Sequence, residues 1–184
     1  MHELILGGQK SGKSRCAELR AADWLACGER REAVLIATAL PGDGEMAERI
    51  ARHRADRAAR VPRLQTLEVP HGLPEAVAEQ SSPQRLLVVD CLTLWLTQLL
   101  LPLAGPALTE SQWLARQAAL CDALREAAGP VVLVSNEIGL GLAPLSRESR
   151  QFLDALGLLH QRVAAVCERV TLMVAGLEMA VKQP

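Results

Sequence analysis

The fold is decided by the stretch LILGGQKSGKS, which runs from Leu4 to Ser14. Its first three residues form a short apolar run, and Gly7, Gly12, Lys13 and Ser14 satisfy the spacing G-x-x-x-x-G-K-[ST]. A segment rich in Arg, Ala, Glu and Leu follows and favours a helix. A strand, a glycine-rich loop and a helix in this order turn backbone N–H groups and a helix N-terminus toward phosphates. The sequence therefore predicts a phosphate-binding loop near its start.

The residues of this loop predict its chemistry. Glycine lets the backbone approach an anion without interference from a Cβ atom. Lys13 would contact the β- and γ-phosphates of a nucleoside triphosphate, and the Ser14 hydroxyl would bind Mg²⁺. The alternative, a glycine turn with an incidental lysine, is disfavoured by the strand and helix on either side. Every residue of the loop is a candidate for nucleotide binding: Gly7, Gly8, Gln9, Lys10, Ser11, Gly12, Lys13 and Ser14.

Composition limits the class of protein. The chain has 184 residues, is 49% hydrophobic and carries a formal net charge of −1. These values predict a single domain over residues 1–184, with no drive toward nucleic acid or anionic membranes. Five cysteines without a C-x-x-C pair favour reduced thiols in a cytoplasmic protein. No signal peptide is evident, and Asp90 and Gln98 interrupt the longest apolar run, so we expect no membrane span.

Short apolar runs alternate with helical patterns along the whole chain, which is typical of a parallel sheet. We expect strands at Glu3–Leu6, Ala33–Ala39, Leu64–Val69, Arg85–Asp90, Val131–Ser135 and Val170–Ala175. We expect helices at Lys13–Cys27, Glu45–Arg60, Leu73–Gln80, Leu92–Leu101, Gln112–Ala128 and Arg147–Cys167. The predicted fold is α/β, an open and mostly parallel P-loop NTPase-type sheet with helices on both faces. Its ligand should lie at the carboxyl ends of the strands.

Polar residues end several of these predicted strands. Asp90 closes the strand RLLVVD, where a carboxylate that shares Mg²⁺ with Ser14 is expected, although a helix N-cap is the alternative. Ala37 and Thr38 end the second strand and are candidates for nucleotide binding. The segment Ser135-Asn136-Glu137 follows the fifth strand at the same edge. A cap or a turn would also suit these two groups.

The segment EMAERIARHRADRAAR contains a histidine among arginines. His53 shares a helix face with Met46, Ile50 and Arg57, and this face should be buried. A core histidine is one interpretation. Cationic neighbours, however, disfavour the imidazolium and keep the nucleophilic neutral ring available. The four arginines nearest to the ring in sequence are Arg49, Arg52, Arg54 and Arg57.

Seven blocks in this order resemble the bifunctional adenosylcobinamide kinase and adenosylcobinamide-phosphate guanylyltransferase family of cobalamin biosynthesis. They are GGQKSGKS, IATA, EMAERIARHR, TLEVP, VVDCLTLWLTQLL, VSNEIGLGLAP and VAGLEMAVK. The resemblance covers nearly the whole chain. It implies a transferase that uses ATP and GTP as substrates with Mg²⁺, and that acts on adenosylcobinamide and its phosphate. It also implies a homo-oligomer, namely a trimer.

The resemblance further implies roles for individual residues. The family phosphorylates the aminopropanol hydroxyl of adenosylcobinamide and then transfers GMP through a GMP-histidine intermediate, and the histidine of its motif aligns with His53. Arg54 and Arg57 would neutralise charge on the nucleotide. Glu68 of TLEVP matches a carboxylate that contacts GTP, and it suits the N–H donors of guanine.

The chain departs from the family pattern at several positions. Leu64 stands where a Trp is usual, and Leu145 and Ser146 replace a polar pair after a proline. Leu158 and His160 replace an Arg and an Asn. The positions of Leu145 and Leu158 bear on a contact between subunits or with the acceptor phosphate.

Other classes of protein remain open at the level of sequence. A small-molecule kinase without covalent nucleotidylation needs only the loop and Asp90, and His53 would then be a core histidine. A GTPase switch would read guanine through N-K-x-D, and the nearest match is the segment from Asn136 to Gly139. A motor ATPase is disfavoured because no arginine-finger segment stands out. A covalent nucleotide formed from GTP would separate these classes.

Overall fold

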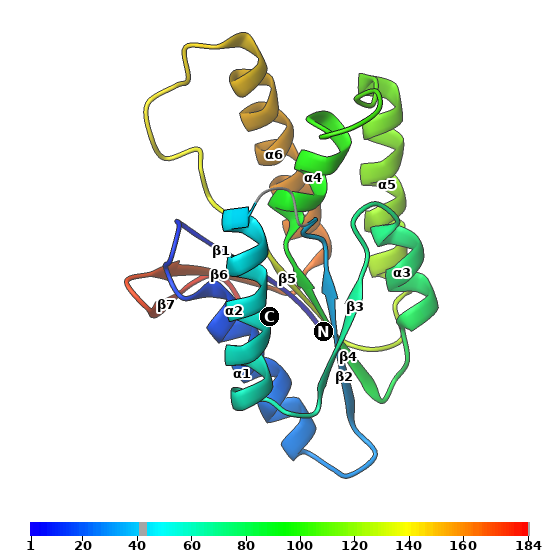
Figure 1. The fold of residues 1–184 in the computed structure, drawn as a ribbon. Helices are drawn as coiled ribbons and strands as arrows, with labels where there is room; N and C mark the ends of the chain where they lie inside the picture. The colour runs from blue at the N-terminus through cyan, green and yellow to red at the C-terminus, as the bar shows by residue number, and fades with distance from the viewer. Residues whose placement is uncertain (41–43, 184) are drawn as a thin grey trace.

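The protein is built around one seven-stranded sheet with helices on both faces (Figure 1). The computed structural model describes residues 1–40 and 44–183, and the side chains of all of these except residues 44–50 and 53. The strand order is β3-β2-β4-β5-β1-β6-β7. The first six of these strands pair in parallel, and β7 pairs antiparallel with β6. The predicted fold class is therefore confirmed.

Strands and helices alternate as the sequence predicts. The strands are β1 (His2–Gly7), β2 (Glu32–Ala37), β3 (Leu64–Glu68), β4 (Arg85–Asp90), β5 (Val131–Val134), β6 (Arg169–Val174) and β7 (Leu177–Lys182). The helices are α1 (Lys13–Ala26), α2 (Gly44–Arg60), α3 (Leu73–Gln80), α4 (Leu92–Leu100), α5 (Glu110–Glu126) and α6 (Arg147–Val166). β4, β5 and β1 are neighbours in the sheet, and their carboxyl ends lie at the edge where a sheet of this kind is expected to bind its ligand. We call the edge formed by the residues after β1 to β5 the carboxyl edge.

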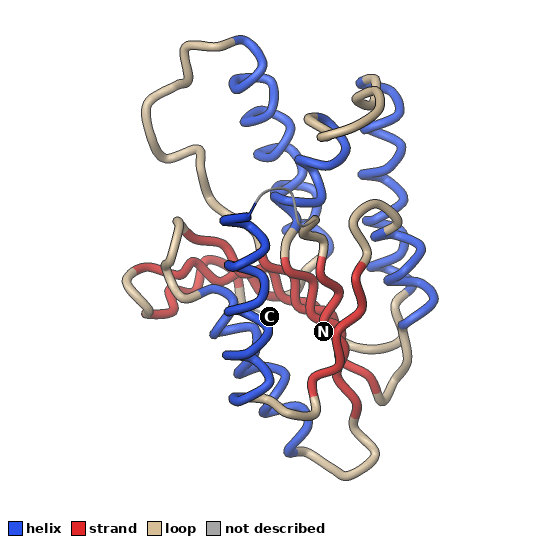
Figure 2. Tube along the Cα trace, in the orientation of Figure 1, coloured by secondary structure: helices blue, strands red, loops and turns tan. Residues whose placement is uncertain are grey.

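Each face of the sheet has its own apolar core. On one face, Cys16, Ala21 and Leu25 of α1 pack against the strands. On the other face, α3, α4, α5 and α6 cover the sheet, and Trp95 meets Trp113 edge to face with ring centroids 5.9 Å apart. Figure 2 shows the sheet between these two groups of helices. Alternate residues of β1 point to opposite cores, so Leu4 belongs to one and Ile5 to the other.

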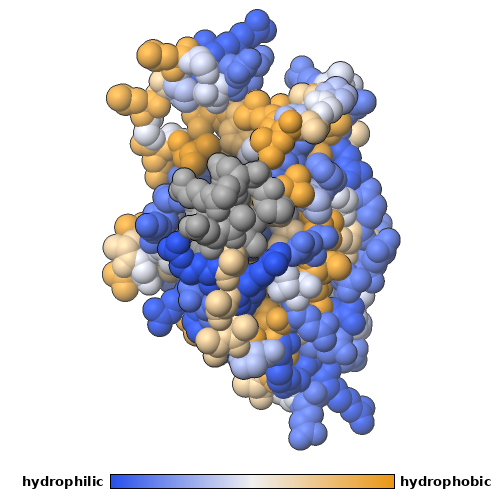
Figure 3. Space-filling view, viewed as in Figure 1, coloured by the Kyte–Doolittle hydropathy of each residue, from blue (hydrophilic) through white to orange (hydrophobic). Residues whose placement is uncertain are grey.

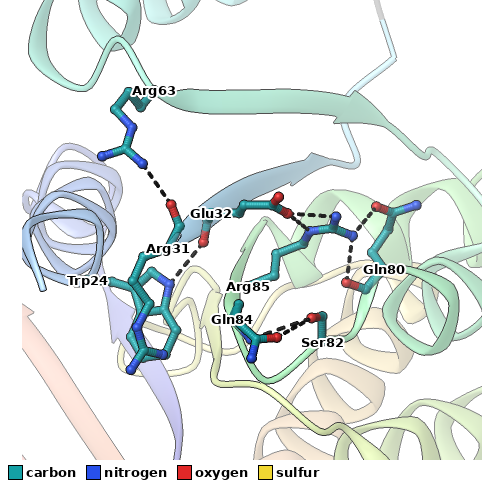
Figure 4. A network of polar contacts seen from close by, with 8 residues as sticks. All are labelled: Trp24, Arg31, Glu32, Arg63, Gln80, Ser82, Gln84 and Arg85. Atoms are coloured by element: carbon teal, nitrogen blue, oxygen red, sulfur yellow. Dashed lines mark hydrogen bonds and ion pairs between the residues drawn. The ribbon is translucent and has the colours of Figure 1, made fainter. Parts of the chain in front are cut away.

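Arginine side chains fasten the edge of the sheet opposite the carboxyl edge (Figure 4). Arg85 at the start of β4 pairs with Glu32 at the start of β2, with Nη2 2.7 Å from Oε2. Arg63 donates to the carbonyl of Arg31 at 2.8 Å, and Arg31 stacks on Trp24 at 3.8 Å from the ring centroid. Arg31, Arg63 and Arg85 therefore stabilise the fold.

The strand β7 is the element that the sequence analysis did not predict. It follows a two-residue turn in which Ala175 has φ 51° and Gly176 has φ 82°. Two successive residues of positive φ match the twist of an antiparallel hairpin. All six residues of β7 are exposed.

At the start of α5, Thr109 and Gln112 form a capping box in which each side chain caps the backbone N–H group of the other residue. Within the described residues, no helix is both long enough and apolar enough to cross a membrane.

Candidate functional site

The loop from Gly7 to Ser14 has the backbone that its sequence predicts. Lys10 has φ 55° and Gly12 has φ 103°, so the chain turns through the left-handed region just before α1. Gly12 is the N-cap residue of α1, and the helix N-terminus therefore opens into the loop. Lys13 is buried, and its Nζ donates to the carbonyl oxygen of Gly8 at 2.6 Å. A positive charge, a helix N-terminus and free space beside Gly8 together suit a phosphate.

The hairpin of β6 and β7 supports this loop from one side. The N–H of Gly176 donates to the carbonyl of Ser11 at 3.0 Å. A Cβ atom on Gly12 would lie 3.3 Å from the Cα of Gly176, and one on Gly7 would lie 2.6 Å from the carbonyl oxygen of Met173. Glycine is required at Gly7 because the loop and β6 approach this closely.

Asp90 lies directly beside the loop. Ser14 donates through Oγ to Asp90 Oδ2 at 3.0 Å. The N-cap residue of α4 is Cys91, which makes no side-chain cap, so the alternative of Asp90 as the helix cap is wrong. Two oxygen atoms this close suit a hard divalent cation that takes its other ligands from phosphates and water.

Thr38 fixes the backbone next to Asp90. This buried residue donates through Oγ1 to the carbonyl of Cys91 at 2.7 Å and accepts from the N–H of Cys91 at 2.9 Å. Its own N–H donates to the carbonyl of Asp90 at 3.1 Å. Ala37 precedes it in register with Asp90. Hydrogen bonds of Thr38 therefore join the carboxyl ends of β2 and β4.

The helix α2 begins at this edge and carries the predicted histidine. His53 lies in α2, and its side chain lies outside the described residues, as do those of Met46, Arg49 and Ile50. Arg54 forms an ion pair with Glu68 at the end of β3. Both of these side chains are more than half exposed.

Two further arginines of α2 lie near the buried Glu18 of α1. Arg57 is buried, as its place on the predicted face requires, and burial lowers its pKa while the charges of Asp90 and Glu18 oppose that shift. Arg60 Nη1 lies 3.2 Å from Oε2 of the buried Glu18. Burial raises the pKa of Glu18, and the charges of Arg60 and Arg57 oppose this. The ion pair of Arg60 and Glu18 therefore links the helix that carries His53 to the helix that begins at the phosphate loop.

The segment after β5 is joined to a histidine that the sequence analysis named only as a departure. Ser135 is buried, and its Oγ lies 2.7 Å from His160 Nε2 and 3.0 Å from Thr93 Oγ1. Glu137 Oε2 lies 3.7 Å from His160 Nδ1. Burial lowers the pKa of His160, and Glu137 opposes the shift. No sequence signal joins residues 23 to 25 positions apart here, because the contact depends on how α6 packs over β5.

The other departures lie away from these contacts. Leu64 is buried in the core on the α1 face, where it packs as an ordinary apolar residue. Leu145 is 97% exposed in the loop before α6, and Leu158 is exposed on α6.

A parallel sheet with a glycine-rich loop after β1 and a carboxylate at the end of β4 defines a P-loop nucleotide-binding protein. The comparison with known sequences is more specific. A sequence model described as cobinamide kinase / cobinamide phosphate guanyltransferase matches residues 3–181. The chain belongs to this family, and it is a transferase.

Named relatives span almost the same length. The bifunctional adenosylcobalamin biosynthesis protein CobP of Pseudomonas aeruginosa is 47% identical over 182 residues, which cover 99% of this chain and 98% of the relative. The bifunctional protein CobU of Salmonella typhimurium is 34% identical, with 97% and 98% covered. The flagellar accessory protein FlaH of Methanocaldococcus jannaschii matches with a TM-score of 0.51 at 13% identity, over 99% of this chain and 78% of FlaH. FlaH supports the fold alone. The bifunctional relatives favour the two-step activity over a kinase without nucleotidylation.

Proposed function

We propose that the protein phosphorylates the hydroxyl of adenosylcobinamide from a nucleoside triphosphate and then transfers GMP from GTP to the resulting phosphate. The products of the second step are adenosylcobinamide-GDP and pyrophosphate. The observation that carries the proposal is the joining of two sites at one edge of the sheet. The phosphate loop with Asp90 suits phosphoryl transfer, and α2, which follows the carboxyl end of β2, would bring His53 and its arginines to the same edge.

The phosphate loop would serve the triphosphate of both steps. Its backbone N–H groups and Lys13 would contact the phosphates, with Gly7, Gly8, Gln9, Lys10, Ser11 and Gly12 forming the cradle. Ser14 and Asp90 would hold Mg²⁺, which neutralises charge on the β- and γ-phosphates when it is bound. Their short separation of 3.0 Å supports this assignment.

In the second step, α2 would supply the nucleophile. A neutral imidazole nitrogen of His53 attacks the α-phosphorus of GTP, and the bond to pyrophosphate breaks. An oxygen of adenosylcobinamide phosphate then attacks the same phosphorus, and the P–N bond breaks. Arg54 and Arg57 would compensate the phosphate charge, and Glu68 would accept from the guanine N–H groups. Ala37 and Thr38 would line the nucleotide between these two sides.

Labelled GTP tests this function directly. GTP labelled at the α-phosphate should leave an acid-labile, base-stable adduct on the peptide that contains His53, and GTP labelled at the γ-phosphate should leave none. His53→Ala should abolish the adduct and GMP transfer but retain phosphorylation of adenosylcobinamide. The matched control is His71→Ala, because His71 is exposed in the loop before α3. A wild type that never labels would instead indicate a plain kinase.

We further propose a homo-oligomer, namely a trimer, in the cytoplasm. Leu140, Leu142 and Leu145 in the loop before α6 are each more than 80% exposed, and Leu177, Met179 and Val181 of β7 are exposed as well. The protruding loop carries apolar side chains at the upper left of Figure 3. Several large apolar side chains exposed on one segment are typical of an interface. Sedimentation equilibrium tests this, and a monomer at all concentrations would contradict it. The five free cysteines fit a reducing compartment.

A further inference from the structure

Glu137 is joined to the first residue of the phosphate loop by one backbone hydrogen bond. It follows β5, the strand that lies between β1 with its loop and β4 with Asp90. The N–H of Ser135 donates to the carbonyl of Ile5 at 3.0 Å, and the N–H of Glu137 donates to the carbonyl of Gly7 at 2.9 Å. The position of Glu137 is therefore fixed by the strand that leads into the phosphate loop.

A chain of polar contacts beneath Glu137 runs from Asn136 to His160. Thr93 Oγ1 accepts from the N–H of Asn136 at 2.8 Å and lies 3.0 Å from Ser135 Oγ, which lies 2.7 Å from His160 Nε2. Burial lowers the pKa of His160, which favours a neutral ring. The carboxylate beside Nδ1 favours the tautomer with its proton on that nitrogen, in which Nε2 accepts from the Ser135 hydroxyl. The Nδ1–H group faces Glu137 Oε2 at 3.7 Å.

These contacts hold a carboxylate that is still accessible. The N–H of Gly139 donates to Glu137 Oε1 at 2.7 Å, and the His160 ring faces Oε2 from the other side. The Glu137 side chain is 24% exposed, whereas that of His160 is 9% exposed. An alcohol at the carboxyl edge can thus reach Glu137 but not His160 or the buried Ser135.

The other described carboxylates at this edge have different partners. Asp90 accepts from Ser14, and a metal held there would keep its oxygens occupied. Glu68 pairs with Arg54 at the far side of β2. Glu18 is buried between α1 and α2 beside Arg60. Glu137 is therefore the described carboxylate that is hydrogen-bonded through its backbone to the start of the loop and that faces the His160 ring.

We propose that Glu137 accepts the proton of the substrate hydroxyl in the phosphorylation step and that His160 is the positioning residue that holds its carboxylate. This inference rests on the proposed kinase activity. The alcohol oxygen forms a bond to the γ-phosphorus, and the bond from that phosphorus to the β–γ bridging oxygen breaks, with its electron pair leaving on the nucleoside diphosphate. The hydroxyl proton passes to a Glu137 oxygen and is then released to solvent.

Substitution of Glu137 tests the proton acceptor. Glu137→Gln keeps the shape and the bond from Gly139 but removes the basic oxygen, so kcat of the kinase step should fall about 10²–10⁴-fold with KM for adenosylcobinamide little changed. Glu137→Asp keeps a carboxylate and should recover a large part of that loss. The matched control is Glu148→Gln, which removes the same charge from an exposed position in the first turn of α6. Adduct formation from labelled GTP verifies that the triphosphate still binds.

Substitution of His160 tests the positioning role. The amide nitrogen of an asparagine overlies Nδ1 of a histidine, whereas that of a glutamine overlies Nε2. His160→Asn should therefore retain kcat within about tenfold of wild type, and His160→Gln should lose more, because general-base catalysis depends on the placement of the base. Thermal unfolding of both variants provides the comparison, since a purely structural role would lower kcat only in step with stability.

Three outcomes would overturn the inference. The first is a Glu137→Gln enzyme with wild-type kcat, and the second is one whose only defect is weaker nucleotide binding. The third is an equal loss of kcat in His160→Asn and His160→Gln. A wild type without turnover of adenosylcobinamide would instead contradict the proposed function, so the two failures are distinguishable.

Discussion

The two sides of the carboxyl edge are built in different ways. The phosphate side, which comprises residues 7–14, Asp90 and the segment 135–137, is held by backbone hydrogen bonds and by short side chains such as Ser14. The α2 side, which comprises Arg54, Arg57 and Glu68, is held by long side chains from a helix. A side built from strands and backbone has few ways to move, whereas a side built from long side chains can change partners at low cost.

In the proposed function, this difference suits each side to one task. Phosphoryl transfer depends mainly on positioning and charge, and the phosphate side would provide both. In the proposed second step, a histidine that is guanylylated and then freed would meet two different partners. The α2 side suits that cycle because the ion pair of Arg54 and Glu68 is exposed and easily exchanged.

The largest effect should come from the phosphate side. Asp90→Ala removes the partner of Ser14 and the carboxylate for Mg²⁺, so both the kinase rate and adduct formation should fall about 10²–10³-fold. Turnover assays measure this, and circular dichroism verifies the fold. The matched control is Asp154→Ala, because Asp154 is exposed on α6. Wild-type turnover in Asp90→Ala would mean that the phosphate side does not act in either step.

A smaller and more selective effect should come from the α2 side. Glu68→Gln replaces an acceptor of guanine N–H groups by a mismatched amide, so the preference for GTP over ATP in adduct formation should weaken by about 1–3 kcal/mol. The kinase step should lose less than adduct formation does. Competition between labelled GTP and unlabelled ATP measures the preference. The matched control is Glu79→Gln on α3, which is exposed. An unchanged preference for GTP over ATP would mean that the guanine base does not contact Glu68.

The smallest effect concerns the stability of the phosphate side at low pH. Burial lowers the pKa of His160 from 6.5, so the unfolded chain binds a proton that the folded chain excludes once the pH falls below 6.5. The free energy of unfolding therefore decreases as the pH falls from 7 to 5, by at most about 1.4 kcal/mol per pH unit for this group. His160→Gln should show a shallower decrease in urea titrations at each pH. Identical slopes would mean that His160 does not titrate with folding.

The sequence predicted the phosphate side better than the rest because its residues are contiguous or end a strand. Gly7 to Ser14 form a local motif, and Asp90 ends an apolar run, so their meeting followed from the parallel sheet. His160 was beyond such reasoning, since its contact with Ser135 depends on the packing of a distant helix. The role of His53 stays a prediction from resemblance.

The strand β7 was missed although a signal for it exists. Ala175 and Gly176 form the turn, and Leu177, Met179 and Val181 alternate after it, as in a hairpin. The apolar residues of this alternation pack against no core within the described chain, because all three are exposed. Periodicity reports burial, and this strand is exposed along its length.

The contact between Gly176 and Ser11 also has a consequence for synthesis. Residues 7–14 leave the ribosome early, and residues 169–182 emerge after most of the sheet has been made. Chains fold progressively as they emerge, but this loop cannot gain its last backbone support before the hairpin exists. A nascent chain should therefore bind a triphosphate tightly only after its hairpin has been released.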